Sequence, residues 1–263
     1  MSATVKLPNT WSAEKRKPGF FWVIASLLLP LWSVLTKYRF TPESKLPETG
    51  PFILSPNHMS ELDPIAVGVA VWKRGRLPRF MAKASIFKVP VVGTIMRLSG
   101  QIPVDRNSRS ASSGGSAGSA TAAASLAAAN ELIARQGGVI VYPEGTLTRD
   151  PELWPMRGKS GAVRLALETG IPLIPAAHWG VQEILPRYGK IKLWGRKTIQ
   201  VAIGQPLDLS SYRGRPINRE ILEQATEQLM TEITRLLAQL RSEPAPPSRW
   251  DPKSHNQSET GRF

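Results

Sequence analysis

Cysteine is absent from this chain of 263 residues, which excludes disulfide frameworks, cysteine-based zinc sites and catalytic thiols. Histidine is scarce: His255 lies near the C-terminus, so His58 and His178 are the two candidates for histidine chemistry. Acidic residues are also few, because 20 Asp and Glu stand against 34 Lys and Arg, which gives a formal net charge of +14. The apolar fraction of 41% is too high for a disordered chain, and the length suits one α/β domain with a small addition.

The excess positive charge indicates an anionic partner, which is nucleic acid, an anionic membrane surface or a phosphorylated substrate. Basic residues gather in residues 72–109 and again in residues 187–197, where they alternate with Tyr188 and Trp194. Solvated faces are the simplest interpretation of both clusters. Zinc-finger spacing, a ribonucleoprotein aromatic motif and a clear helix-turn-helix are missing, so nucleic acid is not expected as a partner. Basic residues beside Trp and Tyr also fit an anionic membrane interface.

The main apolar run, residues 20–35, is 16 residues long and contains Pro30, whereas a bilayer span needs about 20 residues. Basic residues flank it at positions 15–17 and at Lys37 and Arg39. We expect a kinked helix that lies in one leaflet and makes the protein a monotopic membrane protein on the cytoplasmic face. A buried core helix and a signal peptide are the alternatives, but no small-x-small cleavage site follows.

Short apolar segments alternate with helical patterns along the rest of the chain, which predicts an α/β fold with a mostly parallel central sheet flanked by helices. The expected strands are residues 52–55, 79–82, 101–104, 139–142, 171–177 and 198–203. The expected helices are residues 64–72, 121–136, 160–169 and 218–240. We therefore divide the chain into an N-terminal anchoring segment (1–45), a main domain (46–241) and a disordered tail (242–263), with a Ser/Gly-rich linker at 108–119.

His58 and Asp63 lie between an expected strand and an expected helix, at the edge where open α/β sheets bind ligands. Five residues on a regular helix correspond to a rotation of about 140°, so the two side chains meet only if a turn separates them. Asp63-Pro64 is a typical helix start, which favours that turn. A carboxylate that holds one imidazole nitrogen leaves the other nitrogen free to accept a proton from a hydroxyl. An N-cap aspartate beside a loop histidine is the ordinary alternative.

Other chemistries have weaker support around this pair. Ser60 lacks the Gly-x-Ser-x-Gly elbow of a serine nucleophile, and we expect it to be structural. His178 follows an expected strand and fits a core or rim histidine. No second histidine is spaced to complete a metal site, so none is expected.

Four segments, in order, resemble the motifs of the glycerolipid (lysophosphatidic acid) acyltransferase family. Asn57-His58-x4-Asp63 is similar to the first motif and Ile102-Pro103-Val104-Asp105-Arg106 to the second. Tyr142-Pro143-Glu144-Gly145-Thr146 resembles the third, and Ile171-Pro172-Leu173-Ile174-Pro175 the fourth. The similar stretch runs from about residue 40 to residue 209, and the four motifs together are far more specific than the His–Asp pair.

The resemblance implies a transferase that moves a fatty acyl group from acyl-CoA or acyl-carrier protein to 1-acyl-glycerol-3-phosphate, giving phosphatidic acid for phospholipid synthesis. His58 is then the general base and Asp63 orients it, while Arg106 contacts the acceptor's phosphate. The third motif would help to bind the acceptor through Glu144, Gly145 and Thr146. No metal or cofactor is implied, since the acyl donor is itself a substrate.

The sequence departs from the family pattern at two places. Leu147 stands where the family often has Arg, so Arg149, Arg157 and Lys159 are candidates to complete the phosphate site. Of two lysines frequent after the first motif's helix, only Lys83 remains, and we expect it to stabilise the oxyanion electrostatically.

Three competing functions stay open at this point. The same chemistry on glycerol-3-phosphate, another lysophospholipid or a lysoglycolipid would need the same motifs. A non-catalytic lipid-binding protein would not need a poised base. A nucleic-acid-binding protein fits the charge but none of the motifs.

Overall fold

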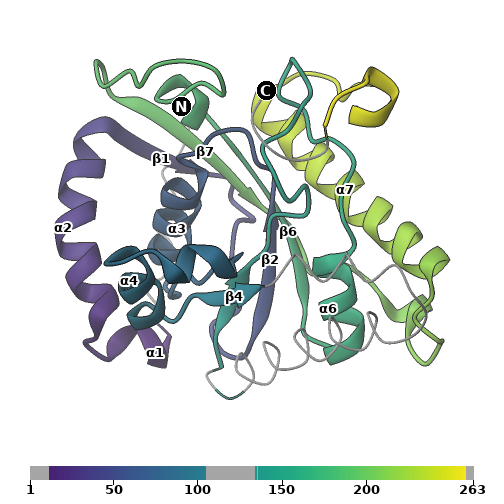
Figure 1. The fold of residues 1–263 in the computed structure, drawn as a ribbon, viewed down its shortest axis with the longest axis horizontal. Helices are drawn as coiled ribbons and strands as arrows, with labels where there is room; N and C mark the ends of the chain where they lie inside the picture. Colours follow the sequence, from purple (N-terminus) through teal and green to yellow (C-terminus); the bar gives the residue numbers. More distant parts are fainter. Residues whose placement is uncertain (1–11, 105–133, 135, 259–263) are drawn as a thin grey trace.

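The computed structural model describes residues 12–104, 134 and 136–258. Its centre is a sheet with the strand order β1-β7-β6-β2-β5, with α2 and α3 on one side and α6 and α7 on the other (Figure 1). The five strands are β1 (Thr36–Phe40), β2 (Phe52–Pro56), β5 (Gly138–Ile140), β6 (Leu173–Trp179) and β7 (Lys197–Ile203). The longer helices are α2 (Phe20–Leu35), α3 (Asp63–Lys73), α6 (Gly161–Thr169) and α7 (Arg219–Arg241).

Smaller elements complete the fold around this sheet. They are α1 (Ala13–Arg16), β3 (Met81–Lys83), η1 (Ala84–Lys88), α4 (Val92–Leu98), β4 (Ile102–Val104), η2 (Val181–Glu183), η3 (Ser210–Tyr212) and η4 (Pro252–His255). The strands β3 and β4 pair in parallel, and a parallel bridge between Phe80 and Ile140 links them to the edge of the main sheet at β5.

The expected mostly parallel sheet is confirmed. The pairs β1–β7, β6–β2 and β2–β5 are parallel, whereas β6 and β7 run antiparallel. The strand β2 is buried on both faces: Ile53 packs with residues of α6 and α7, and Leu54 packs with residues of α3. Apolar residues on both faces explain why this strand is a continuous apolar run in the sequence.

The predicted domain boundary at residue 45 is wrong, because residues before it are part of the central sheet. The strand β1 pairs with β7 from Thr36 to Phe40. Trp32 of α2 donates from Nε1 to the Tyr38 hydroxyl at 2.8 Å, and that hydroxyl donates to the Ala66 carbonyl of α3 at 3.0 Å. The N-terminal segment is therefore built into the main domain.

The helix α2 buries one face and exposes the other. Ala25 and Trp32 are buried, and Trp22 meets Trp72 of α3 edge to face with ring centroids 5.2 Å apart. The opposite face has a row of exposed apolar side chains, which are Val23, Leu27, Leu31 and Val34. No helix in the described ranges is both long and apolar enough to cross a bilayer.

The prediction of a disordered tail is wrong for residues 242–258, which fold back onto the domain. The backbone N–H of Arg157 donates to the Trp250 carbonyl at 3.0 Å, and the Trp250 ring stacks on His255 at 3.6 Å. The expected linker at 108–119 and most of the expected helix at 121–136 lie outside the described residues.

Candidate active site

The candidate site lies where parallel strands end. The chain leaves β2 at Pro56 and β5 at Ile140, and these neighbouring strands point the same way. His58 follows the first strand and Glu144 follows the second, so two segments separated by more than eighty residues meet at one sheet edge. The backbones of Lys83 and Val104 pair at the ends of β3 and β4. The parallel bridge between Phe80 and Ile140 sets this strand pair beside β5, so both residues lie on the side of the same sheet edge.

His58 and Asp63 form the predicted pair. His58 Nδ1 and Asp63 Oδ2 are 2.9 Å apart, and the Asp63 side chain is fully buried while that of His58 is 16% exposed. The same oxygen accepts the backbone N–H groups of Met59 at 2.6 Å and Ser60 at 2.8 Å, which closes the tight turn between the two residues. Since a carboxylate is an acceptor, Nδ1 carries the ring proton and leaves Nε2 as the basic nitrogen.

The helix α3 begins at Asp63, and its N-cap residue is Leu62. The sequence predicts Asp63 as the N-cap and Pro64 as the first helical residue, so the helix begins one residue earlier than expected. The Asp63 carboxylate therefore bonds backward into the turn that carries His58.

The backbone of His58 is fixed from two sides. Its N–H donates to Glu144 Oε1 at 2.9 Å, and its carbonyl accepts the N–H of Thr148 at 2.7 Å. Glu144 Oε2 accepts the N–H of Met156 at 3.0 Å. Burial is the main cause that raises the pKa of Glu144 to about 8.

Glu144 of the third motif lies inside the protein. The residue has no exposed surface, and both carboxylate oxygens are engaged by backbone N–H groups. It holds the turn of His58 against the loop at 148–156, and its part in binding the acceptor stays a prediction.

Aromatic and polar neighbours restrict the His58 ring and its supports. The imidazole stacks on Tyr142 with centroids 4.1 Å apart. His178 is buried beside Asp63. Its Nε2 lies 3.1 Å from the Asn57 carbonyl oxygen and 3.7 Å from Asp63 Oδ2. Burial lowers the pKa of His178, so this histidine stays neutral and packs as a core residue, as the sequence analysis expects.

Ser60 is placed as a structural residue. Its side chain is buried, and its hydroxyl donates to the Leu185 carbonyl at 2.8 Å and accepts the N–H of Leu62 at 3.2 Å. These bonds tie the turn to the chain that follows β6.

The remaining predicted residues are only partly brought together. Lys159 packs against Gly145, which has φ +71°, while Thr146 is half-buried in the same turn. Arg157 is exposed and lies 3.6 Å from Asp251 of the tail. Arg106 is outside the described residues, and for Lys83 only the backbone, at the end of β3, is described.

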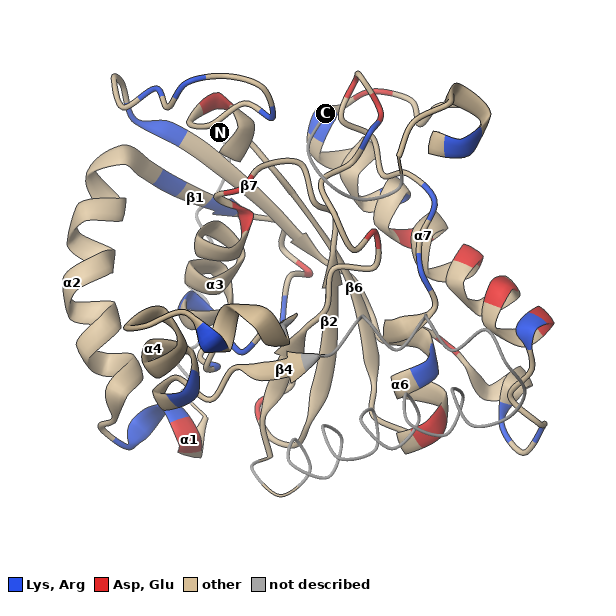
Figure 2. Cartoon of the chain, in the orientation of Figure 1, with Lys and Arg blue, Asp and Glu red and all other residues tan. Residues whose placement is uncertain are grey.

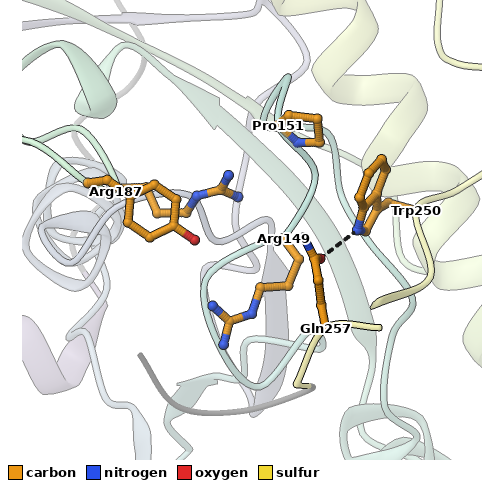
Figure 3. Close-up of a pocket in the computed structure, with 6 residues that line it drawn as sticks. Arg149, Pro151, Arg187, Trp250 and Gln257 are labelled. Atoms are coloured by element: carbon orange, nitrogen blue, oxygen red, sulfur yellow. Dashed lines mark hydrogen bonds between the residues drawn. The ribbon is translucent and has the colours of Figure 1, made fainter. Parts of the chain in front are cut away.

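Arg149 is 4% exposed and lines a pocket of about 450 Å³ (Figure 3). Its other lining residues are Pro151, Arg187, Tyr188, Trp250 and Gln257. From the sequence, Arg187 and Tyr188 are expected in a basic cluster without a site, and Trp250 and Gln257 in a disordered tail. An isolated Trp in a proline-rich tail was the one signal that this segment packs.

Asn57 is a second supporting residue that only the structure reveals. Its side-chain oxygen accepts the N–H of His178 at 2.9 Å, and its amide nitrogen donates to the His178 carbonyl at 3.3 Å. This amide pair joins the turn of His58 to the strand β6. Within the described ranges, no group of three or more His, Asp or Glu side chains is placed to hold a metal ion.

Known proteins were compared with the chain in sequence and in structure. The chain is 28% identical over 184 residues to the chloroplast 1-acyl-sn-glycerol-3-phosphate acyltransferase BAT2 of Brassica napus, covering 67% of this chain and 48% of that protein. It is 28% identical over 197 residues to the 1-acyl-sn-glycerol-3-phosphate acyltransferase of Bacillus subtilis, covering 74% and 85%. The chain spans about half the length of the plant relatives it matches.

The fold has a counterpart among solved structures. The 1-acyl-sn-glycerophosphate (LPA) acyltransferase PlsC from Thermotoga maritima superposes with a TM-score of 0.56 at 20% identity, covering 83% of this chain and 75% of that one. At this identity the likeness concerns the fold. A sequence model of the Acyltransferase family matches residues 37–179, which include most of β1, the His58 turn, Glu144 and all of β6. The chain belongs to the acyltransferase family.

Proposed function

We propose that this protein is an O-acyltransferase that transfers a fatty acyl group to the free hydroxyl of 1-acyl-glycerol-3-phosphate and so makes phosphatidic acid. The observation that carries the proposal is the 2.9 Å contact between His58 Nδ1 and buried Asp63 Oδ2. It leaves Nε2 of a partly exposed ring without a hydrogen bond to any described residue. The names of the plant and bacterial relatives support the acceptor.

In the proposed reaction, Nε2 of His58 accepts the proton of the acceptor hydroxyl as its oxygen attacks the thioester carbonyl. The negative charge of Asp63 stabilises the imidazolium that forms. The tetrahedral intermediate then collapses, the C–S bond breaks, and the imidazolium returns its proton to the leaving thiolate. The acyl group passes directly to the acceptor, and the donor is acyl-CoA or acyl-carrier protein.

The phosphate of the acceptor needs positive charge near the base. We assign this role to Arg106 and Arg149. We assign to Lys83 the electrostatic stabilisation of the tetrahedral intermediate. Support for Arg149 comes from its burial and from its place directly after Thr148, whose N–H bonds the His58 carbonyl. Gly145 and Thr146, in the turn that carries Glu144, are assigned to acceptor binding. Glu144 supports the same site and also positions the backbone of His58.

We also propose that the protein associates with an anionic membrane surface as a monotopic protein, on the cytoplasmic face. The exposed apolar row on α2 supports this, because one face of the helix packs on the protein and the other is unoccupied. Trp194 is 94% exposed in the loop before β7, which also carries Lys190, Lys192 and Arg196, and Lys197 begins β7. Figure 2 shows basic residues along this loop. Tryptophan and basic side chains favour the headgroup region of anionic leaflets.

The test offers the purified protein several acyl-CoAs and acyl-carrier protein with 1-acyl-glycerol-3-phosphate, glycerol-3-phosphate, other lysophospholipids and a lysoglycolipid, while free thiol is followed. We expect the highest kcat/KM with 1-acyl-glycerol-3-phosphate. His58→Ala should lower turnover by about 10²–10⁴-fold, because the general base is lost. Gln239→Ala is the control, since Gln239 is exposed on α7 and its loss should leave turnover unchanged.

If no donor–acceptor pair releases thiol, the enzyme proposal is wrong and a lipid-binding protein becomes the better interpretation. Release that His58→Ala does not reduce would remove His58 as the base but keep the transferase. Preference for glycerol-3-phosphate would keep the chemistry and change the acceptor.

A further inference from the structure

The pocket of about 450 Å³ beside the active site is built from three segments far apart in the sequence (Figure 3). Arg149 and Pro151 come from the loop after the third motif, and Arg187 and Tyr188 come from the chain after β6. The third segment is the C-terminal tail, which contributes Trp250 and Gln257. None of the six lining residues belongs to the four family-like motifs.

The loop that carries Arg149 also holds the turn of the base. The N–H of Thr148 donates to the His58 carbonyl at 2.7 Å, and Arg149 is the next residue. Arg187 Nη1 reaches the same loop and donates to the carbonyl of Thr148 and, at 2.9 Å, to the carbonyl of Asp150. The pocket is therefore one residue away from the backbone that fixes His58.

Two arginines, Arg149 and Arg187, line this pocket. Arg149 is buried, and the described lining residues include two arginines and no carboxylate. The nearby Asp150 uses Oδ1 to accept the N–H of Glu152 at 2.7 Å. Asp150 interacts electrostatically with Arg187, and guanidinium groups on a pocket can offer charge-assisted hydrogen bonds to an anion.

Arg187 is poised to bind a further acceptor atom. Its hydrogen bonds to the described chain all leave from Nη1, so Nη2 has no acceptor among the described residues. The guanidinium lies 4.7 Å from the centroid of the Tyr188 ring, which restricts its orientation. A planar guanidinium with unused donors matches the geometry of a phosphate group.

The tail gives the pocket a fixed outer wall. Trp250 Nε1 donates to Gln257 Oε1 at 3.1 Å, which is the dashed line in Figure 3. The Trp250 ring stacks on His255, and the Gln257 N–H donates to the Pro252 carbonyl at 2.8 Å. Asp251 pairs with Arg157 at 3.6 Å. These contacts hold the wall in place before any ligand binds.

We propose that this pocket binds a substrate phosphate group. Arg187 supplies one of the two guanidinium groups that line the pocket, and Trp250 of the tail forms its outer wall. The identification of that phosphate as one belonging to a reactant rests on the proposed acyl transfer. It comes from the acceptor's phosphate monoester or from the coenzyme of the donor, which share the same chemistry.

The first test measures binding without turnover. The full chain and its Arg187→Ala and Arg187→Lys variants are titrated by calorimetry with glycerol-3-phosphate and with free coenzyme A. Loss of charged hydrogen bonds should weaken the binding of one probe by about 10- to 100-fold in Arg187→Ala, and less in Arg187→Lys. Arg235→Ala is the matched control, because Arg235 is exposed on α7 and pairs with Glu232.

The probe that loses affinity identifies the source of the phosphate. Loss for glycerol-3-phosphate assigns the pocket to the acceptor, and loss for coenzyme A assigns it to the donor. Unchanged affinity of Arg187→Ala for both probes overturns the proposal.

The second test separates substrate binding from a structural role of Arg187. Arg187→Ala should raise KM for the matching substrate with kcat changed far less, whereas a purely structural role would lower kcat and the melting temperature with KM unchanged. Trp250→Ala, which leaves both arginines in place, should also raise that KM, and it keeps the proposal testable if Arg187→Ala does not fold.

The two proposals fail in different ways. If the wild type shows no thiol release but Arg187→Ala loses probe binding, acyl transfer is wrong and the phosphate pocket stands. If the wild type transfers acyl groups and both variants keep wild-type KM for every substrate, the pocket proposal is wrong and the enzyme stands.

Discussion

One carboxylate oxygen of Asp63 organises the base. Oδ2 contacts the ring of His58 and also the backbone N–H groups of Met59 and Ser60, so the ring and its turn share one anchor. The backbone of His58 is held in addition by Glu144 and by Thr148. A ring fixed by both its side chain and its backbone loses little entropy when a hydroxyl approaches, which favours proton transfer.

Glu144 makes stability depend on pH in a predictable direction. Burial raises its pKa from 4.5 to about 8, so the folded state keeps a proton that the unfolded state releases. This contribution to stability is fully present below the unfolded pKa and is lost as the pH rises toward about 8. The slope within that window is at most ~1.4 kcal/mol per pH unit.

Glu144→Gln removes this titration, so the stability of the wild type relative to the variant should fall between pH 5 and pH 8. Urea unfolding at pH 5, 6.5 and 8 measures the difference. Comparing the two proteins cancels groups that titrate in both, such as His178. Parallel stability profiles would show that Glu144 is already ionised in the folded protein.

At the scale of elements, α2 has two apolar faces with different neighbours. One face packs through Trp22 and Trp32 toward α3, and the other exposes a row that includes Leu27 and Leu31. No Lys, Arg, Asp or Glu interrupts the helix (Figure 2). The strand β1 follows α2 directly and pairs with β7. A membrane bound to the exposed face of α2 would therefore lie at a fixed distance from the central sheet.

The double variant Leu27→Asp/Leu31→Asp should weaken binding to anionic vesicles by about tenfold or more, because charge is costly in the apolar layer. Both side chains are mostly exposed, so the melting temperature should change little. Cosedimentation with phosphatidylglycerol vesicles measures the effect. Gln239→Asp, an exposed position on α7, serves as the control. Equal binding of the double variant and the control would exclude α2 as the membrane contact.

At the scale of the whole molecule, the charge of +14 has two uses. Some basic residues are internal: Arg76 is 1% exposed and donates to the carbonyls of Gly50 and Gln136 and to Glu14. Arg79 is also buried and pairs with Glu14 at 2.8 Å. Two arginines of the cluster at 72–109 therefore connect α1 to the loops that precede β2 and β5. Only the remaining basic residues of that cluster are available to an anionic partner.

Arg76→Ala should lower the free energy of unfolding by about 3–5 kcal/mol, since it leaves the carbonyls of Gly50 and Gln136 without their buried donor, while Glu14 keeps its pair with Arg79. Arg235→Ala removes an exposed pair on α7 and should cost less than about 1 kcal/mol. Guanidinium chloride unfolding of the two variants compares them. Equal losses would show that Arg76 is no more than a surface charge.

Local patterns were sufficient for much of the architecture. Alternating apolar segments predicted β2, β6, β7, α3, α6 and α7 to within about two residues at most ends. The strand β1 was missed because basic residues alternate with Tyr38 and Phe40, a pattern that also fits a membrane flank. The packed tail was missed because composition reports its prolines and not the contact of Trp250 with Arg157.

The sequence by itself determined the class of fold and the pairing of His58 with Asp63, because both depend on spacing over a few residues and on the helix start between them. The tertiary structure alone decided the place of Glu144, which meets His58 only because β2 and β5 end at one edge. It also decided which arginines are internal and which line the pocket with the tail. Such contacts join residues tens to hundreds of positions apart, and the packing of the sheet and helices brings them together.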